Sequence, residues 1–266
     1  MLDRYNRPIT YLRISVTDRC NLRCSYCMPE GGVQLLPKSE ILSLEEIADI
    51  VKTGTELGIR KIRLTGGEPL VRKGIVDLVA MIREIESIEE VTMTTNGVFL
   101  KEFALPLKKA GLSRVNISLD SVSPDQFSKI TRGGNLARVL EGIKAAREAG
   151  LNPVKINVVK LNNEDDQDIA AIKRFVEENG LKIRFIRQMD LQTGQYSRVE
   201  GGEGGDCLIC NRLRLTANGL IKPCLFSNKE FSVKEHGARN AFLLALGAKP
   251  EKGVWSNTHN FYNIGG

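Results

Sequence analysis

The residues best suited to chemistry in this 266-residue chain are its six cysteines, which fall into two groups of three. The groups have the spacings Cys-x3-Cys-x2-Cys and Cys-x2-Cys-x13-Cys, and they are Cys20, Cys24 and Cys27, then Cys207, Cys210 and Cys224. The N-terminus has no apolar segment of the kind that a secretion signal requires, so a cytoplasmic location is expected. Clustered thiols in a cytoplasmic chain favour metal ligation over a disulfide framework.

The first cysteine group directly follows the first expected strand, where parallel α/β folds place their chemistry. Three thiolates on one short loop can bind three irons of a [4Fe–4S] cluster and leave the fourth iron open. An open coordination position suits a reactive metal centre. The alternative is a zinc site with a fourth ligand from elsewhere, but the only histidines, His236 and His259, lie far away in the sequence.

This cysteine spacing resembles the signature of the radical S-adenosylmethionine (SAM) superfamily. In that superfamily SAM binds the open iron, and its reductive cleavage yields a 5′-deoxyadenosyl radical. The string Gly66-Gly-Glu-Pro69, one β/α unit later, looks like the GGEP motif of the superfamily, although such a string alone is also compatible with a simple turn. Tyr26 is similar to the aromatic residue that contacts adenine. The resemblance therefore implies SAM contacts from Tyr26, Gly67 and Glu68.

The second cysteine group flanks an expected hairpin and again supplies three metal ligands. The strings Cys210-Asn-Arg-Leu-Arg-Leu-Thr and Pro223-Cys-Leu-Phe closely resemble the C-terminal region of the GTP 3′,8-cyclase family. That family catalyses the first step of molybdenum cofactor biosynthesis, and its second [4Fe–4S] cluster leaves an iron open for the purine of GTP. Arg212 and Arg214 alternate on a strand, so they share a face on which guanidinium groups can bind phosphate. An exposed basic strand beside a structural metal is the alternative.

The resemblance covers nearly the whole chain and implies further site residues. The implied GTP contacts are Arg13, Arg63, Thr94, Lys155, Arg212, Leu213 and Arg214. Further SAM contacts are implied for Ser118 and Met189, and a catalytic role is implied for the terminal pair Gly265 and Gly266. Together these positions recur at successive strand ends of one expected sheet, which chance placement would not produce.

Two departures from the family concern the substrate cavity. Where the family has Phe-Ile-Glu-x-Met-Pro, this chain has Phe185-Ile-Arg-Gln-Met-Asp190, so Arg187 replaces a carboxylate. Between Met189 and Cys207 the chain is also several tens of residues shorter than the family, and a glycine-rich loop stands in place of the missing segment. We therefore expect a more open or differently shaped cavity, which bears on the identity of the substrate more than on the class of chemistry.

The elements that must position these residues alternate along most of the chain. Short β-branched runs predict strands at 11–16, 61–65, 91–94, 115–119, 154–159 and 183–186. Helical patterns between them lie at 43–58, 75–85, 102–109, 136–149 and 165–178. Six β/α units in series imply a parallel sheet, either open and doubly wound or a partial barrel, because six units are too few for a closed eight-stranded barrel. The resemblance favours an α/β fold with a partial (β/α)6 TIM-like barrel and a small C-terminal iron–sulfur domain.

The change of pattern after Met189 predicts three segments. A radical SAM partial barrel is expected at 1–190 and a glycine-rich linker or loop at 191–206. An auxiliary iron–sulfur cluster region with a C-terminal tail is expected at 207–266. The latter contains a hairpin turn at Asn218-Gly219 and a helix near 238–246.

Composition excludes several classes of protein. With 42% hydrophobic and 26% charged residues, the chain is globular in composition and neither disordered nor fibrous. No run of about 18 apolar residues exists, so no membrane association is expected. The net charge of +6 fits an anionic partner or simple solubility equally well. The cations implied to bind substrate are spread over several strands and form no basic run, which does not favour a nucleic-acid substrate.

The leading hypothesis is a lyase of the GTP 3′,8-cyclase type, with two [4Fe–4S] clusters and SAM. The resemblance implies conversion of GTP to (8S)-3′,8-cyclo-7,8-dihydroguanosine 5′-triphosphate. It also implies flavodoxin or ferredoxin as reductant, cyclic pyranopterin monophosphate synthase as the next enzyme, and a monomer or homodimer. One alternative is a radical SAM enzyme with an auxiliary cluster that acts on a peptide or another nucleotide. An electron-transfer or metal-storage protein has no use for the GGEP string.

Overall fold

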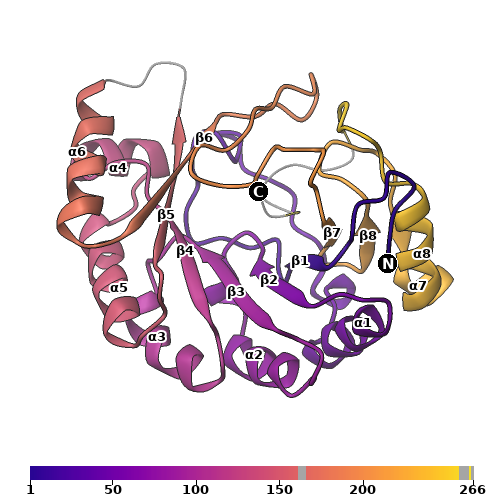
Figure 1. The fold of residues 1–266 in the computed structure, drawn as a ribbon. Coiled ribbons are helices and arrows are strands. Elements are labelled where there is room, and N and C mark those ends of the chain that lie inside the picture. Colours follow the sequence, from indigo (N-terminus) through magenta and orange to yellow (C-terminus); the bar gives the residue numbers. More distant parts are fainter. Residues whose placement is uncertain (161–165, 258–263, 265–266) are drawn as a thin grey trace.

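The computed structural model describes residues 1–160, 166–257 and 264, and at its centre lies one curved sheet. Within the described residues the strand order is β6-β5-β4-β3-β2-β1-β7-β8-β9. The strands are β1 (Tyr11–Ser15), β2 (Lys61–Thr65), β3 (Glu90–Thr95), β4 (Arg114–Ser118), β5 (Lys155–Lys160), β6 (Lys182–Arg187), β7 (Arg212–Leu215), β8 (Leu220–Lys222) and β9 (Phe231–Ser232). Strands β1 to β6 pair in parallel, and helices line the outside of the curve (Figure 1). The expected α/β partial barrel is confirmed.

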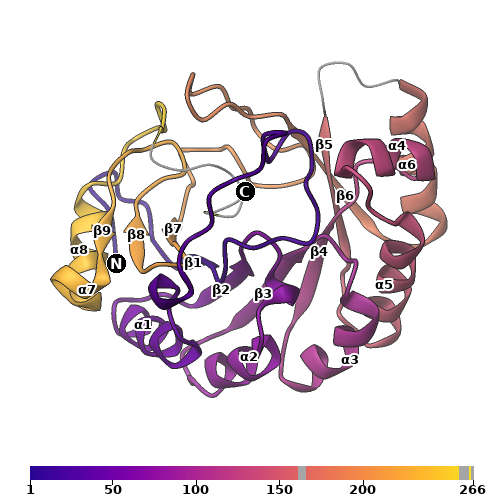
Figure 2. The ribbon, with the colours of Figure 1, turned by 180° about the vertical axis from the view of Figure 1, so that it is seen from behind.

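The helices follow the strands in the expected order (Figure 2). They are α1 (Leu44–Glu56), α2 (Ile75–Arg83), α3 (Leu100–Lys109), α4 (Pro124–Thr131), α5 (Leu136–Glu148), α6 (Asp166–Glu178), α7 (Val233–His236) and α8 (Ala238–Gly247), with short 3-10 helices at Lys38–Glu40 and Pro69–Val71. The capping box of α1 is present, because Ser43 Oγ accepts from the Glu46 amide while the Glu46 carboxylate accepts from the Ser43 amide. In the described parts of the chain, no helix combines the length and the apolar character needed to cross a bilayer.

Helix α4 is the one barrel helix that the sequence patterns did not predict. It has only eight residues, and its apolar positions Phe127 and Ile130 are too few to establish a helical period. Ser123 and Pro124 nevertheless suit its start, because proline at the first helical position loses no hydrogen bond.

The C-terminal region continues the sheet of the barrel. The expected hairpin is confirmed, since β7 and β8 pair antiparallel through a turn in which Gly219 has a positive φ of 86°. Strand β7 also pairs in parallel with β1, on the side opposite β2. The division into segments at 1–190, 191–206 and 207–266 stays a prediction, and hydrogen bonding of the sheet runs across it.

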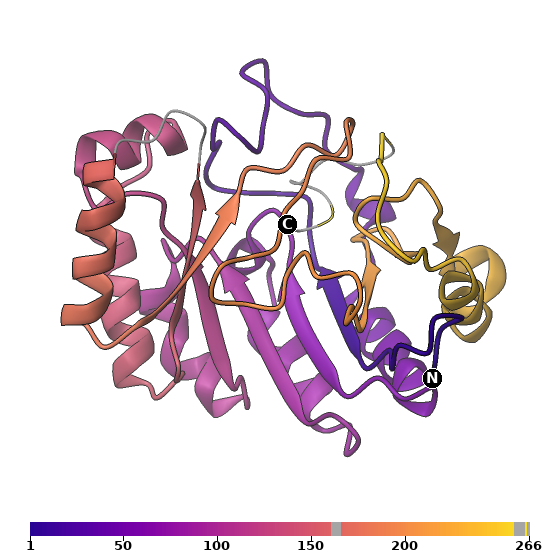
Figure 3. The same ribbon diagram turned by 45° about the horizontal axis from the view of Figure 1, so that its top comes forward.

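The register of β1 with its two neighbours collects positive charge on one face of the sheet. Arg13 lies directly opposite Arg63 of β2 and opposite Arg214 of β7. Because side chains alternate along a strand, the three guanidinium groups share the inner face, while Leu12 and Ile14 are fully buried on the outer face. Figure 3 shows the segment between β6 and β7 crossing this inner face.

Packing of α5 against the turn after β3 gives a direct test of the fold. A Cβ atom on Gly142 of α5 would lie 2.4 Å from the carbonyl oxygen of Gly97. Glycine-to-alanine changes usually stabilise a helix interior, but here we expect Gly142→Ala to lower the free energy of unfolding by about 1–3 kcal/mol through overpacking. Urea unfolding measures this. Gly247→Ala, at the end of α8 with no atom within 4 Å of the new Cβ, is the control. A Gly142→Ala protein as stable as the wild type would contradict the packing described.

Candidate active site

Two adjoining cavities occupy the inside of the partial barrel. The smaller has a volume of about 190 Å3 and lies between the loop after β1 and the carboxyl ends of the other barrel strands; we call it the cysteine-loop cavity. The larger, of about 500 Å3, lies against the inner face of the sheet and is called the arginine cavity. Asn157, Ile186 and Met189 line both. Ligands in the two cavities would therefore face each other across these three side chains.

All three cysteines of the first group line the cysteine-loop cavity as free thiols. Burial raises the pKa of Cys20 to about 11 and those of Cys24 and Cys27 to about 12; repulsion from Glu68 adds to the increase at Cys20, and repulsion from neighbouring cysteines adds to it at Cys24 and Cys27. Thiols gathered in this way become thiolates only when a cation neutralises them. In the described residues, no three Cys, His, Asp or Glu side chains are arranged to hold a single metal ion. Three separate thiolates instead suit an iron–sulfur cluster, in which each thiolate binds a different iron.

Helix α4 fixes the cysteine loop from outside the cavity. The Ile130 carbonyl accepts a hydrogen bond from the Ser25 amide at 2.9 Å. Arg132, in the left-handed conformation at the end of α4, donates to the carbonyl oxygens of Arg23 and Met28 at 3.0 and 2.8 Å. The helix that sequence reasoning missed therefore holds the loop that carries three of the predicted metal ligands.

The GGEP string packs tightly onto the start of the cysteine loop. The Gly67 amide donates to the Thr17 carbonyl, and the Glu68 amide donates to the Arg19 carbonyl, both at 2.8 Å. A Cβ atom on Gly67 would lie 2.3 Å from the Arg19 carbonyl oxygen, so glycine is needed there for the approach of the two backbones. The motif thus sets the position of the cysteine loop as well as lining the cavity.

The Glu68 carboxylate joins three segments at the base of the cysteine-loop cavity. One oxygen accepts from Thr95 Oγ1 at 2.6 Å and from the Leu70 amide at 3.0 Å, and the other accepts from the Asn96 amide at 2.7 Å. Burial outweighs these hydrogen bonds and raises the pKa of Glu68 to about 7. A cation such as an ammonium group in the cavity would restore the ionised form, so this carboxylate is suited to the amino end of a ligand.

The other predicted SAM contacts also line the cysteine-loop cavity, namely Tyr26, Ser118 and Met189. The Tyr26 hydroxyl donates to Asp120 at 2.8 Å, and Asp120 also accepts from the Val159 amide. Burial raises the pKa of Asp120 to about 6. Thr94, implied to contact GTP, lines this smaller cavity and not the larger one, and its buried hydroxyl has no hydrogen-bond partner among the described residues.

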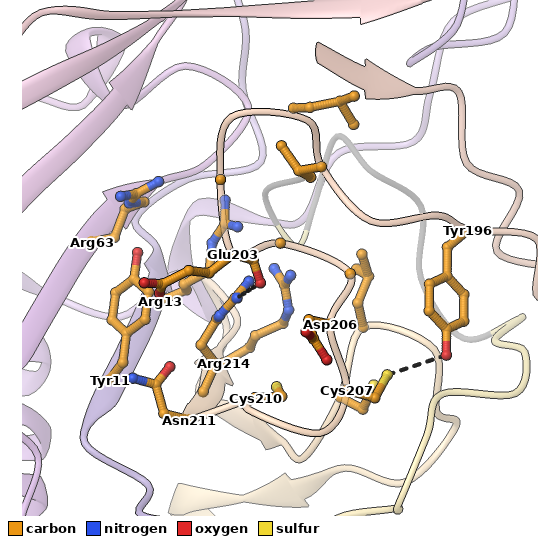
Figure 4. A pocket seen from close by; sticks show the side chains of 18 of the residues that line it. Tyr11, Arg13, Arg63, Tyr196, Glu203, Asp206, Cys207, Cys210, Asn211 and Arg214 are labelled. Atoms are coloured by element: carbon orange, nitrogen blue, oxygen red, sulfur yellow. Dashed lines mark hydrogen bonds between the residues drawn. The ribbon is translucent and has the colours of Figure 1, made fainter. Parts of the chain in front are cut away.

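The arginine cavity collects an unusual excess of positive charge. Of the described residues, nine cationic side chains line it: Arg13, Lys61, Arg63, Arg114, Lys155, Arg184, Arg212, Arg214 and Lys249. Three carboxylates accompany them, from Glu90, Glu203 and Asp206. Figure 4 shows Arg13, Arg63 and Arg214 around the cavity together with Glu203. The charge favours a polyanionic ligand.

Burial makes this excess charge energetically costly. Arg13, Arg63 and Arg214 are only 9%, 8% and 7% exposed. Burial, followed by repulsion from neighbouring arginines, lowers the pKa of Arg13 and Arg63, and it lowers that of Arg214 to about 10. The pKa values of Lys155 and Arg184 are lowered for the same reasons. A bound polyanion would relieve both effects at once.

The second cysteine group lines the same cavity as these cations. Cys207, Cys210 and Cys224 are free thiols, and the Cys210 amide donates to the Cys207 carbonyl in a tight turn. Tyr196 Oη and Cys207 Sγ are 3.2 Å apart in a hydrogen bond (Figure 4). A Cβ atom on Gly253 would lie 3.3 Å from Cys224 Sγ, so the backbone closes around this sulfur. The donor set again suits an iron–sulfur cluster, beside an anion-binding surface.

Of the predicted site residues that the structure describes, one lines neither cavity. The Leu213 side chain is fully buried in the hydrophobic core on the other face of β7. Gly265 and Gly266 lie outside the described residues. Ile264, immediately before them, is 2% exposed and packs with Leu225 and Phe226, which line the arginine cavity.

The sequence patterns placed the five implied cations along strand ends, and this was wrong for Arg13, Arg63 and Arg214. These three arginines lie within their strands, on the inner face. The patterns also missed Lys249, which lies outside the strands, and the strand residues Lys61, Arg114 and Arg184. The alternation of side chains along a strand could have identified the strand residues, because residues two apart point to the same face. Lys61 precedes Arg63 by two residues, and Arg184 precedes the cavity-lining Ile186 by two residues.

The glycine-rich loop forms a packed wall of the arginine cavity. The backbones of Phe185 and Glu200 exchange two hydrogen bonds at 3.1 and 3.0 Å, which fixes the loop to β6. A Cβ atom on Gly201 would lie 2.7 Å from the Ile183 carbonyl, and one on Gly205 would lie 2.1 Å from the Ser197 carbonyl. Both glycines also have a φ of +76°. The glycines thus permit close packing of the loop that was expected at 191–206.

Comparison with known proteins defines the class of this fold and site. A family model described as the radical SAM superfamily matches residues 14–176, which include the first cysteine group and the GGEP string. The structure of Streptococcus suis SuiB bound to S-adenosylmethionine has the same fold, with a TM-score of 0.66 and 16% identity. That likeness covers 89% of this chain and 64% of SuiB, so the chain spans less than two thirds of SuiB. The chain is a radical SAM protein.

Sequence relatives define the family more narrowly. The GTP 3′,8-cyclase of Petrotoga mobilis is 43% identical, over 98% of this chain and 95% of the relative. The GTP 3′,8-cyclase of Alkaliphilus oremlandii is 41% identical, over 100% of this chain and 98% of the relative. Both alignments extend over 314 positions, so the relatives carry residues that this 266-residue chain lacks. Within the radical SAM superfamily, the chain belongs to the GTP 3′,8-cyclase family.

Ionisation of Glu68 makes the stability of the protein depend on pH. Its pKa of about 7 lies above the ordinary value of 4.5, so the folded protein retains a proton that the unfolded chain releases between these pH values. Without clusters or ligands, this group should lower the free energy of unfolding by on the order of 1–3 kcal/mol as pH rises through that window. Glu68→Gln should remove this part of the slope in urea unfolding measured at several pH values. The exposed Glu86→Gln serves as the control, and an unchanged slope in Glu68→Gln would refute the assignment.

Proposed function

We propose that this chain is a GTP 3′,8-cyclase, which joins C3′ of the ribose to C8 of guanine in GTP. The observation that carries the proposal is the pair of adjoining cavities that share Asn157, Ile186 and Met189. One cavity contains three thiols and the GGEP carboxylate, and the other contains three further thiols beside an excess of cations. Such an arrangement can hold a radical source and a nucleoside triphosphate next to each other.

The cysteine-loop cavity fits a [4Fe–4S] cluster and SAM. Cys20, Cys24 and Cys27 would hold the cluster, and Glu68 would meet the amino group of SAM. When bound and reduced, this pair supplies an organic radical able to abstract hydrogen from carbon. The protein would place Tyr26 and Met189 around SAM. It would also orient the reactive end of SAM towards the residues that line both cavities.

The arginine cavity fits GTP in size and charge. Its volume of about 500 Å3 lies in the usual range for small-molecule sites. A triphosphate bears roughly four negative charges near neutral pH, from the acidity of phosphate groups. Arg13, Arg63 and Arg214, with further cations around them, would neutralise it by bidentate hydrogen bonds. Cys207, Cys210 and Cys224 would hold the auxiliary cluster near the base of the nucleotide.

Several finer parts of the proposal rest on membership of the family. The product would be (8S)-3′,8-cyclo-7,8-dihydroguanosine 5′-triphosphate, passed on to cyclic pyranopterin monophosphate synthase in molybdenum cofactor biosynthesis. Flavodoxin or ferredoxin would supply electrons, in the cytoplasm, to a monomer or homodimer. The terminal pair Gly265 and Gly266 would act on the substrate. Burial of Ile264 against Leu225 and Phe226, which line the arginine cavity, supports that role, because Ile264 directly precedes the pair in the sequence.

Iron content tests the two cluster sites. Anaerobically reconstituted protein should contain about eight irons, because each [4Fe–4S] cluster has four. Replacing Cys20, Cys24 and Cys27 with alanine should remove half of the iron and all cleavage of SAM. The matched variant with Cys207, Cys210 and Cys224 replaced should also lose half, yet retain SAM cleavage. Stoichiometric zinc after anaerobic purification, with no gain in activity from added iron, would rule out the proposal.

Binding of GTP tests the arginine cavity. Arg212→Ala and Arg214→Ala should each weaken binding by roughly 1.5–3 kcal/mol in calorimetry, the usual scale of a hydrogen bond to a charged group. We expect ATP to bind less well than GTP, and added salt to weaken both because charge holds the triphosphate. Arg198→Ala is the control, since that exposed arginine does not line the cavity. No binding of GTP by the wild type would instead favour a peptide substrate.

A further inference from the structure

Lys249 is a buried cation whose surroundings differ from those of the other lysines and arginines in the arginine cavity. Its side chain is 1% exposed, although it lies on the lining of the cavity. Its ammonium group donates to the Arg212 carbonyl at 2.7 Å, to the Pro223 carbonyl at 2.9 Å and to Cys210 Sγ at 3.4 Å. An ammonium group has three protons, so these acceptors use all of them. None is left for a phosphate.

The three acceptors belong to both arms of the hairpin that carries the second cysteine group. Arg212 begins β7 two residues after Cys210, and Pro223 follows β8 directly before Cys224. Lys249 therefore ties together the two chain segments that bring these sulfurs to one place. Its own segment is fixed in turn by Arg7, which donates to the carbonyls of Pro250 and Glu251 at 2.6 and 2.8 Å.

The charge of Lys249 lacks the usual partner of a buried lysine. Among the described residues, no carboxylate lies within 4.0 Å of its ammonium group to form an ion pair. A buried cation is costly unless an anion compensates it. Cys210 Sγ is its one acceptor that can carry a full negative charge.

We propose that Lys249 is a positioning residue of the auxiliary cluster, which holds the Cys210 ligand by an N–H···S hydrogen bond and raises the reduction potential of that cluster. The inference rests on the proposed function, because it takes the second cysteine group to bind a [4Fe–4S] cluster. Hydrogen bonds to cluster sulfurs and nearby positive charge stabilise the reduced, more negative state. Lys249 thus serves the cluster, while the arginines of the cavity serve the triphosphate.

The test measures the auxiliary cluster alone, in the full-length chain with Cys20, Cys24 and Cys27 replaced by alanine. In that background, Lys249→Met should move the midpoint potential of the remaining cluster to a more negative value in an EPR-monitored titration. Lys252→Met removes one charge from an exposed position three residues away and should leave the potential unchanged. Equal potentials in Lys249→Met and its parent would overturn the inference.

A second measurement needs no substitution of Lys249 and applies even where Lys249→Met fails to fold. With lysine side chains labelled with 15N at Nζ, pulsed EPR of the reduced auxiliary cluster should show a 15N coupling through the N–H···S hydrogen bond. Absence of the coupling would overturn the inference. Failure of the proposed function would be distinguishable from failure of this inference. If the second cysteine group held no cluster, the chain with the first cysteine group replaced would bind no iron and give no EPR signal.

Discussion

The structure depends on a row of three buried guanidinium groups held side by side by strand pairing. Parallel pairing of β1 with β2 and with β7 sets Arg63, Arg13 and Arg214 opposite one another, at about the 4.8 Å spacing of neighbouring strands. Like charges so close in a buried place repel, and the aromatic ring of Tyr11, 5.7 Å from the Arg63 guanidinium carbon, offsets only part of this. Binding of a polyanion would therefore be favourable, because it would relieve this repulsion. In its absence, hydrophobic burial elsewhere in the barrel must offset the cost of holding the three charges together.

The same pairing links the two cysteine groups. Strand β1 leads into the first group at its carboxyl end, and β7 begins two residues after Cys210 of the second group. The two strands run in parallel, so the groups lie towards opposite ends of one strand pair, with Arg13 and Arg214 between them. Substrate held by these arginines would lie between the two metal sites. Geometry of this kind explains why one short sheet can serve both the radical source and the substrate.

Local sequence signals predicted much of this arrangement, and tertiary contacts decided the rest. The barrel strands and α1 followed from β-branched runs and from the Ser43 cap, because these signals act within a few residues. The inward cations were harder to recognise, since a strand with alternating charged residues is typical of a solvated surface; Arg184 was missed for that reason. Helix α4 was too short for its period to be seen, and the close packing around Gly205 depends on partners that no local pattern specifies.

The central claim is that the radical source and GTP lie on either side of Asn157, Ile186 and Met189, the three residues that line both cavities. The most direct test supplies GTP carrying deuterium at C3′ of the ribose to the anaerobically reconstituted protein with SAM and a reductant. Mass analysis of the 5′-deoxyadenosine should show that it has gained one deuterium, alongside a cyclised nucleotide that has lost it. Cleavage of SAM without any deuterium in the 5′-deoxyadenosine, and with GTP unchanged, would contradict the account.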